Sequence, residues 1–167
     1  LLAGIVAARV TGIPYLTLAD MGCVAAPLGL FFGRLANFVN GELWGAPTDL
    51  PWGVVFGGMA GDMPRHPSQL YEALLEGVVI FCVLFALSRK VPPRPRGTFL
   101  GVFLIMYGAF RFLVEFVREP DVQLGYLWGG WLTMGQVLSL PLVAVGVAVL
   151  VYAIRMKKPQ QGLPKMS

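Results

Sequence analysis

Charged side chains are scarce in this sequence, since only 13% of its 167 residues are Asp, Glu, Lys or Arg. Hydrophobic residues make up 56%, and the mean hydropathy is +0.70. Water-soluble domains carry about 25% charged residues, so the composition excludes that class and indicates a protein that resides in a lipid bilayer.

Cysteine and histidine are rare as well, with two cysteines and one histidine. Cys23 and Cys82 both lie in apolar segments, and neither belongs to a CxxC pair or has a histidine nearby. This pattern argues against a metal site and against a structural disulfide. We expect both thiols to be buried by packing.

Four segments are long and apolar enough to cross a membrane as helices, which takes about 20 residues each. They are residues 15–32, 67–88, 98–117 and 133–154, and residues 1–8 are the tail of a fifth. The predicted fold class is therefore an all-α, polytopic transmembrane helix bundle. It comprises residues 1–158, including a loop at 34–66, and is followed by a tail at 159–167.

The basic residues predict the orientation of the bundle, because Lys and Arg are retained on the cytoplasmic side of a membrane. Nine of the thirteen fall in alternate connections: Arg9, Arg89, Lys90, Arg94, Arg96, Arg155, Lys157, Lys158 and Lys165. The other connections carry acids such as Glu42 and Asp121 and all four tryptophans, which favour the headgroup level. We expect a multi-pass protein with a cytoplasmic C-terminus.

A dense polar stretch follows the first complete span, from Gly33 to Trp52. It places Arg34, Asn37 and Glu42 where a membrane helix meets water, among glycines that permit sharp turns or a close approach of the backbone to a ligand. A polar helix end followed by an ordinary loop would explain the charges. It would not explain so many amides and glycines, so the stretch favours a built site.

A second polar face lies within the segment 98–117 and just beyond it. Tyr107, Arg111, Glu115 and Arg118 are spaced 4, 4 and 3 apart, which puts them on one side of a helix. Ionisable groups in a spanning helix are costly and normally face a cavity or a partner. Arg111 and Glu115 could instead form an intrahelical ion pair that only holds the bundle together.

The segment 67–88 carries a third polar face, with Gln69, Glu72 and Glu76 at positions i, i+3 and i+7. His66 stands at its entry. A single histidine at a helix start is more often a cap or a packing contact than a catalytic base. In the last segment only Gln136 and Ser139 interrupt the apolar pattern, and we expect them to bond between helices.

The three faces together offer arginines near one headgroup level, at Arg34, Arg111 and Arg118. A planar guanidinium binds phosphate through two parallel hydrogen bonds, so a phospholipid headgroup is the expected ligand. The sequence has no metal-binding cluster, no GxSxG, no Gly-rich phosphate loop and no nucleic-acid motif. It therefore predicts lipid chemistry without a cofactor, a metal or a nucleic acid. A carrier or scaffold that only holds the anion is the alternative, although the inverted repeats common in transporters are not evident.

The motifs at these positions resemble those of one enzyme family. The run Gly33-Arg34-Leu35-Ala36-Asn37-Phe38-Val39-Asn40-Gly41-Glu42-Leu43-Trp44-Gly45 closely resembles the signature of the bacterial prolipoprotein diacylglyceryl transferases. Residues 65–72, 107–116, 118–121 and 134–136 resemble further motifs of that family, in the same order. The resemblance covers nearly the whole chain.

This resemblance implies an inner-membrane enzyme of about seven helices. Such an enzyme moves the diacylglyceryl group of phosphatidylglycerol to the lipobox cysteine thiol of a prolipoprotein, forming a thioether and releasing glycerol 1-phosphate. The implied catalytic residues are Arg34 and Arg111. The implied substrate-binding residues also include Asn37, Glu42, Gly45, Tyr107, Glu115 and Arg118, with His66, Gln69 and Glu72 as further candidates.

One departure from the family pattern concerns the family's His-Gly-Gly motif. The resemblance places that motif in a helix before residue 1, so we expect the chain to be N-terminally truncated. The motif's histidine, to which a catalytic role is sometimes assigned, has no counterpart here, and His66 matches a different motif. We therefore expect the chain on its own to be inactive, with Glu72 or Arg111 facing lipid where a wall of the site is missing.

Overall fold

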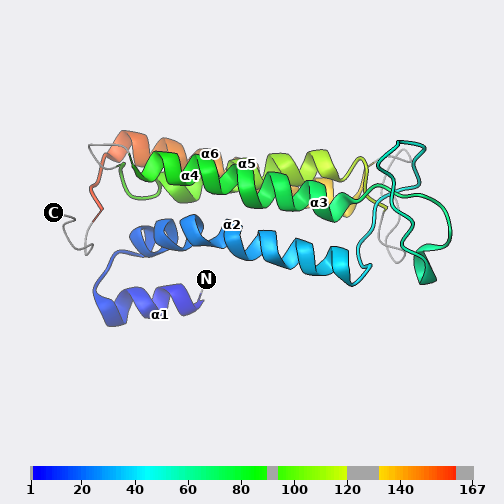
Figure 1. Cartoon of the computed structure of the whole chain (residues 1–167). Helices are drawn as coiled ribbons and strands as arrows, with labels where there is room; N and C mark the ends of the chain where they lie inside the picture. Colours follow the sequence, from blue (N-terminus) through cyan, green and yellow to red (C-terminus); the bar gives the residue numbers. More distant parts are fainter. Residues whose placement is uncertain (1, 90–93, 120–131, 161–167) are drawn as a thin grey trace.

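The computed structural model describes residues 2–89, 94–119 and 132–160 (Figure 1). Its helices are α1 (Leu2–Thr11), α2 (Tyr15–Val39), η1 (Gly58–Ala60), α3 (Ser68–Glu72), the π-helical η2 (Ala73–Val79), α4 (Ile80–Ser88), α5 (Thr98–Val114) and α6 (Met134–Met156). The described residues contain no β-strand beyond three isolated bridges. The predicted all-α class is confirmed.

Three helices are long and apolar enough to cross a membrane, at Tyr15–Val39, Ser68–Ser88 and Met134–Met156. The apolar α5 is shorter, at 17 residues. Figure 1 shows that α2 lies beside α3–η2–α4 and α5, that α6 packs on α5, and that α1 folds back along α2. A small core of Cys23, Ile80, Leu84 and Phe99 holds α2, α4 and α5 together.

The two ends of the bundle differ in the way the sequence predicts. The α1–α2 connection, the end of α4, the start of α5 and the end of α6 lie at one end of the bundle, and the loop between α2 and α3 lies at the other (Figure 1). Arg9 and Arg155 lie in the last turns of α1 and α6. Parts of the connection between the predicted segments 98–117 and 133–154, and of the tail 159–167, lie outside the described residues.

Two helix boundaries differ from the prediction. α2 continues seven residues past the expected end at 32, so Arg34 and Asn37 stand on its last turns rather than in a loop. Nothing between Gly33 and Val39 breaks a helix, and the chain turns only at Gly41, whose φ is +66°. α5 ends at Val114, three residues before the expected end at 117.

The expectation that both thiols are buried is wrong for one of them. Cys23 is buried, whereas Cys82 lies on the outer surface of α4. A helix that is apolar all round gives no sign of which side packs. The sequence therefore could not decide whether Cys82 faces the bundle or its surroundings.

Glycines bring α5 and α6 into close contact. A Cβ at Gly101 would lie 2.9 Å from the Leu150 backbone nitrogen, and one at Gly146 would lie 2.9 Å from that of Ile105. Small residues allow such close approach between membrane helices. Gly29 and Gly33 lie four residues apart on α2, and a Cβ at either position would have no neighbour within 4 Å among the described residues.

A buried aspartate on α2 fixes the start of α5. Asp20 is 3% exposed, and its carboxylate accepts hydrogen bonds from the backbone N–H groups of Gly97 (2.6 Å) and Leu100 (2.8 Å) and from Nε2 of Gln160 (2.7 Å). The first N–H groups of a helix have no partner within the helix. Asp20 therefore caps α5 from a neighbouring helix.

We expect Asp20→Ala to lower the free energy of unfolding by about 1–3 kcal/mol, because it leaves buried donors at the start of α5 without an acceptor. Asp20→Asn keeps one acceptor oxygen and should lose less. Chemical unfolding of the purified chain in detergent measures both. Equal stability of Asp20→Ala and the unaltered chain would show that the cap contributes nothing.

Candidate functional site

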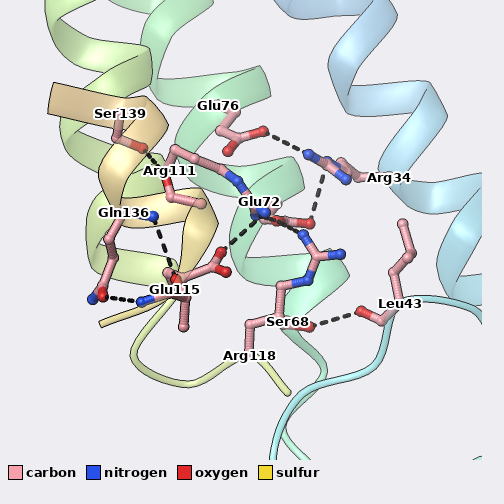
Figure 2. A network of polar contacts seen from close by, with 12 residues as sticks. Arg34, Leu43, Ser68, Glu72, Glu76, Arg111, Glu115, Arg118, Gln136 and Ser139 are labelled. Carbon is pink, nitrogen blue, oxygen red and sulfur yellow. Dashed lines mark hydrogen bonds and ion pairs between the residues drawn. The ribbon is translucent and has the colours of Figure 1, made fainter. Parts of the chain in front are cut away.

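Six charged side chains from separate parts of the chain meet near the end of the bundle that carries the α2–α3 loop (Figure 2). We call them the Arg–Glu cluster. Its members are Arg34 on α2, Glu72 on α3, Glu76 on η2, Arg111 on α5, and Glu115 and Arg118 just after α5.

Glu72 is the centre of the cluster. One carboxylate oxygen lies 3.2 Å from Nε of Arg34, and the other lies 2.5 Å from Nη1 of Arg111 and 4.0 Å from Nη1 of Arg118. The side chain is 1% exposed. Arg34 and Arg111, 77 residues apart, therefore meet at a shared carboxylate. Glu72 faces the bundle interior, so the expectation that it faces lipid is wrong.

Arg111 joins α5 to α3 as well as to its own helix end. Its Nη2 lies 2.9 Å from Oε2 of Glu115, the i,i+4 pair that the spacing predicts. The carboxylate of Glu115 lies against Gly135 of α6, where a Cβ would come within 2.6 Å of it. The intrahelical pair exists, and it is one part of a network that spans several helices.

Glu76 completes the cluster one turn further into the bundle. It is fully buried, and its Oε2 lies 3.3 Å from Nη2 of Arg34. Its Oε1 is buried and has no hydrogen-bond partner among the described residues. Glu76 lies in the π-helical segment η2, a rare geometry that occurs often at functional sites.

The formal charges of the cluster cancel, with three guanidinium groups and three carboxylates. Burial of an unpaired charge is very costly, and pairing with good geometry reduces that cost. The carboxylates are almost fully enclosed, whereas Arg34 and Arg111 keep 15% and 16% of their side chains exposed. The arginines are therefore the members best placed to meet a ligand.

The α2–α3 loop is fastened beside the cluster by backbone contacts. Oγ of Ser68 donates to the Leu43 carbonyl (3.0 Å), and Nε2 of Gln69 donates to the Glu42 carbonyl (2.6 Å). The Gly45 N–H donates to the His66 carbonyl at 2.9 Å. The candidate Gln69 is thus a tie between the loop and α3.

Gly45 sits where the loop passes between two other segments. A Cβ at this position would lie 2.6 Å from Cβ and the carbonyl oxygen of His66 and 2.6 Å from the carbonyl oxygen of Val117. Gly45 also pairs with Arg118 in an isolated antiparallel bridge. Only glycine fits between these backbones without moving them.

We expect Gly45→Ala to lower the free energy of unfolding by about 1–3 kcal/mol, because the backbone of His66 or Val117 must shift to admit the methyl group. Gly33→Ala makes the same chemical change where the described residues leave open space, and it should have no such cost. Thermal unfolding of the two variants in detergent measures the difference. Similar losses in both would contradict the steric argument.

A second group of contacts ties the loop to the segment after α5. Arg65 forms an ion pair with Glu119, and Nε1 of Trp44 donates to the same carboxylate at 2.9 Å. The Arg65 guanidinium lies 5.9 Å from the centre of the Trp44 ring. These contacts fasten the backbone that carries Arg118.

The remaining candidates lie around the cluster. Nδ1 of His66 is 3.3 Å from the Tyr71 hydroxyl, and within the described ranges the imidazole has no hydrogen bond or ion pair to the cluster. Tyr107 stands one turn before Arg111 and stacks on Phe103. Asn37 follows Arg34 by one turn of α2, and the Glu42 side chain is exposed.

The expectation that Gln136 and Ser139 bond between helices is wrong. Gln136 and Thr133 form a capping box at the start of α6: Oε1 of Gln136 accepts from the Thr133 N–H (3.0 Å), and Oγ1 of Thr133 accepts from the Gln136 N–H (3.3 Å). Oγ of Ser139 donates to the Gly135 carbonyl of its own helix. Thr133, three residues before Gln136, is the signal for this box in the sequence.

Sequence reasoning gave no role to Glu76, although the i, i+3, i+7 pattern places it beside Gln69 and Glu72. It also left Glu72 as a secondary candidate. The signal was present, because an acid within a spanning segment is a candidate functional group.

The fold and the cluster define a class: a polytopic α-helical membrane protein with an enclosed arginine–glutamate network near one end of its spans. The sequence comparison gives the family. Residues 1–152 match the family model described as prolipoprotein diacylglyceryl transferase, and the chain belongs to that family.

Curated relatives agree with this assignment. The chain is 56% identical over 145 residues to the phosphatidylglycerol–prolipoprotein diacylglyceryl transferase of Methylococcus capsulatus, covering 87% of the chain and 54% of the relative. It is 59% identical over 136 residues to that of Nitratidesulfovibrio vulgaris strain Miyazaki F (81% and 50%) and 50% identical over 160 residues to that of Vibrio atlanticus (96% and 57%). The chain spans about half the length of these relatives.

Proposed function

We propose that this chain forms the phosphate-binding part of a phosphatidylglycerol:prolipoprotein diacylglyceryl transferase. The observation that carries the proposal is the meeting of Arg34 and Arg111 at one enclosed carboxylate near the end of the spanning helices. Relatives that match most of the chain are named for this transfer. The phosphatidylglycerol headgroup and the lipobox peptide are the proposed substrates.

In the proposed reaction, a cysteine thiolate attacks the glycerol carbon that is bonded to phosphate. The carbon–sulfur bond forms, the carbon–oxygen bond breaks with its electron pair going to oxygen, and glycerol 1-phosphate leaves. Negative charge therefore grows on the phosphate. Arg34 and Arg111, held by Glu72, stabilise that charge more strongly in a partly dehydrated site than they would in water.

The other cluster residues keep the two arginines in place. Glu115 orients the Arg111 guanidinium from one side, and Glu72 does so from the other. Gly45 and Gln69 hold the loop that carries Glu42 against α3 and the end of α5. Tyr107, Asn37 and Arg118 are proposed to line the headgroup site.

We propose that the protein lies in the bacterial inner membrane, with the Arg–Glu cluster toward the outer leaflet and the C-terminus in the cytoplasm. The segregation of basic residues to the other end of the bundle supports this orientation. Residues 1–158 are the proposed catalytic bundle and 159–167 the proposed cytoplasmic tail. A labelling experiment with membrane-impermeant thiol reagents, on single cysteines placed at each end, tests the sidedness.

A thioether-formation assay tests the proposed activity. Membranes with phosphatidylglycerol and a lipobox peptide receive either the chain itself or the chain preceded by the N-terminal part of the Methylococcus capsulatus relative, at matched levels. We expect a peptide bearing diacylglycerol only with the extended chain. A protein that binds phosphatidylglycerol but never modifies the peptide in either form would be a carrier or scaffold.

A further inference from the structure

The formal charges of the cluster sum to zero, and its proposed ligand is an anion. Three guanidinium groups face three carboxylates, so a bound phosphodiester adds one uncompensated negative charge to a site with little exposure to solvent. Such a charge disfavours nearby carboxylates in their ionised form. Uptake of one proton by a carboxylate of the cluster would restore neutrality.

The three carboxylates differ in how firmly the arginines hold them. Glu72 has three guanidinium groups within 4.0 Å of its oxygens. Glu115 lies 2.9 Å from Arg111. Among the described residues Glu76 has one ion pair, at 3.3 Å to Nη2 of Arg34, and its Oε1 is buried there with no hydrogen-bond partner.

The ligand competes for the same nitrogen that holds Glu76. A guanidinium presents parallel N–H pairs along two edges, Nε with Nη2 and Nη1 with Nη2, and phosphate binds such a pair. Nη2 has one N–H on each edge. A phosphate that binds the edge occupied by Glu76 takes that contact, and a phosphate on either edge brings its negative charge to the guanidinium that pairs with Glu76. Glu72 keeps Arg111 in either arrangement.

The charged and titratable groups around Glu76 come from α2, α3 and α5, three of the four helices packed against η2, and α4 contributes none of them. They are Arg34 on α2, Glu72 on α3, and Tyr107 and Arg111 on α5. A phosphate bound to Arg34 would weaken the pairing of Arg34 with Glu76. Glu72 carries a negative charge as well, so it cannot compensate the charge of Glu76. The remaining cation, Arg111, is already shared by Glu72 and Glu115.

We propose that Glu76 takes up one proton when an anionic phosphodiester headgroup binds Arg34, so that headgroup binding is coupled to protonation of this buried carboxylate. The inference rests on the proposed function, because it assumes the phosphate site at Arg34 and Arg111. It makes Glu76 a residue that balances charge in the lipid-bound state.

Calorimetry can count the proton. The purified chain in detergent is titrated with a short-chain phosphatidylglycerol at one pH in two buffers that differ in their enthalpy of ionisation. We expect uptake of about one proton per lipid bound, and an affinity that weakens by up to about tenfold per pH unit on the alkaline side. Short-chain diacylglycerol, which has no phosphate, should cause no uptake.

Variants identify the carboxylate. Glu76→Gln should bind the same lipid with no proton uptake and with an affinity independent of pH, whereas Glu76→Asp should retain uptake. Asp20→Asn, which alters another buried carboxylate on the same bundle, should also retain it. Uptake that persists in Glu76→Gln, or binding by the unaltered chain without uptake, would overturn the inference.

Difference infrared spectroscopy provides a measurement that needs no variant. The unaltered chain, labelled with carbon-13 glutamate, should gain the carbonyl band of a protonated glutamic acid when the lipid binds. No such band at saturating lipid would refute the inference and leave the phosphate site intact. Failure of the unaltered chain to bind phosphatidylglycerol at any pH would instead refute the proposed phosphate site, and with it this inference.

Discussion

Replacing Arg34 or Arg111 by lysine is expected to slow diacylglyceryl transfer by about a hundred- to a thousand-fold, the usual cost of losing one preorganised donor to a developing anion. Lysine keeps the charge but cannot present two parallel N–H groups. Each of these arginines also spans two carboxylates: Arg34 contacts Glu72 and Glu76, and Arg111 contacts Glu72 and Glu115. An ammonium group cannot reproduce both contacts with the same geometry.

The measurement is the thioether-formation rate of the extended chain at varied phosphatidylglycerol concentration. Loss of transition-state stabilisation should appear mainly in kcat rather than in KM. Arg155→Lys makes the same change in an exposed side chain at the end of α6, and its rate should be unchanged. Full activity of both cluster variants would exclude the shared phosphate site.

Replacing Glu72 by alanine should destabilise the chain more than any other single change proposed here. The carboxylate is 1% exposed and is the common partner of Arg34 and Arg111. Removing one member of a buried ion pair costs about 3–5 kcal/mol, because the remaining charge is left without compensation. Arg34 and Arg111 would each lose one of their two carboxylate partners at once.

Unfolding of the purified chain in detergent, followed by helical content, measures this loss. Asp49→Ala removes a carboxylate that is exposed on the loop, and its effect should lie within about 0.5 kcal/mol of zero. Glu72→Gln, which keeps the volume and one acceptor oxygen, should fall between the two. A Glu72→Ala variant as stable as Asp49→Ala would mean that the cluster does not hold the helices together.

Much of the candidate site follows from spacing along the sequence. Tyr107, Arg111 and Glu115 are one turn apart, and their common face and the Arg111–Glu115 ion pair are both present in the structure. The glycine-rich stretch after Arg34 does form the loop that packs beside the cluster. Local periodicity predicts such features because the geometry of a helix is the same wherever the helix lies.

Other features could not be predicted, because apolar membrane helices give no sign of their rotation. The amphipathic pattern that reveals the buried side of a soluble helix is absent when both sides are apolar. The exposure of Cys82 was missed for this reason. The role of Gln136 was missed for another reason. Its amide oxygen accepts a hydrogen bond at the start of its own helix, and the presence of a polar residue does not show whether its partner is local or distant.

The sequence by itself determined that this protein is a membrane-spanning helical bundle of the diacylglyceryl transferase family, and that its arginines lie near the ends of their helices. Only the tertiary structure decided that Glu72 is the common partner of Arg34 and Arg111, that three arginines and three glutamates meet in one cluster, and that Glu76 makes the longer of the contacts to Arg34. Composition and period are properties of single segments, whereas these pairings depend on how α2, α3 and α5 are rotated against one another.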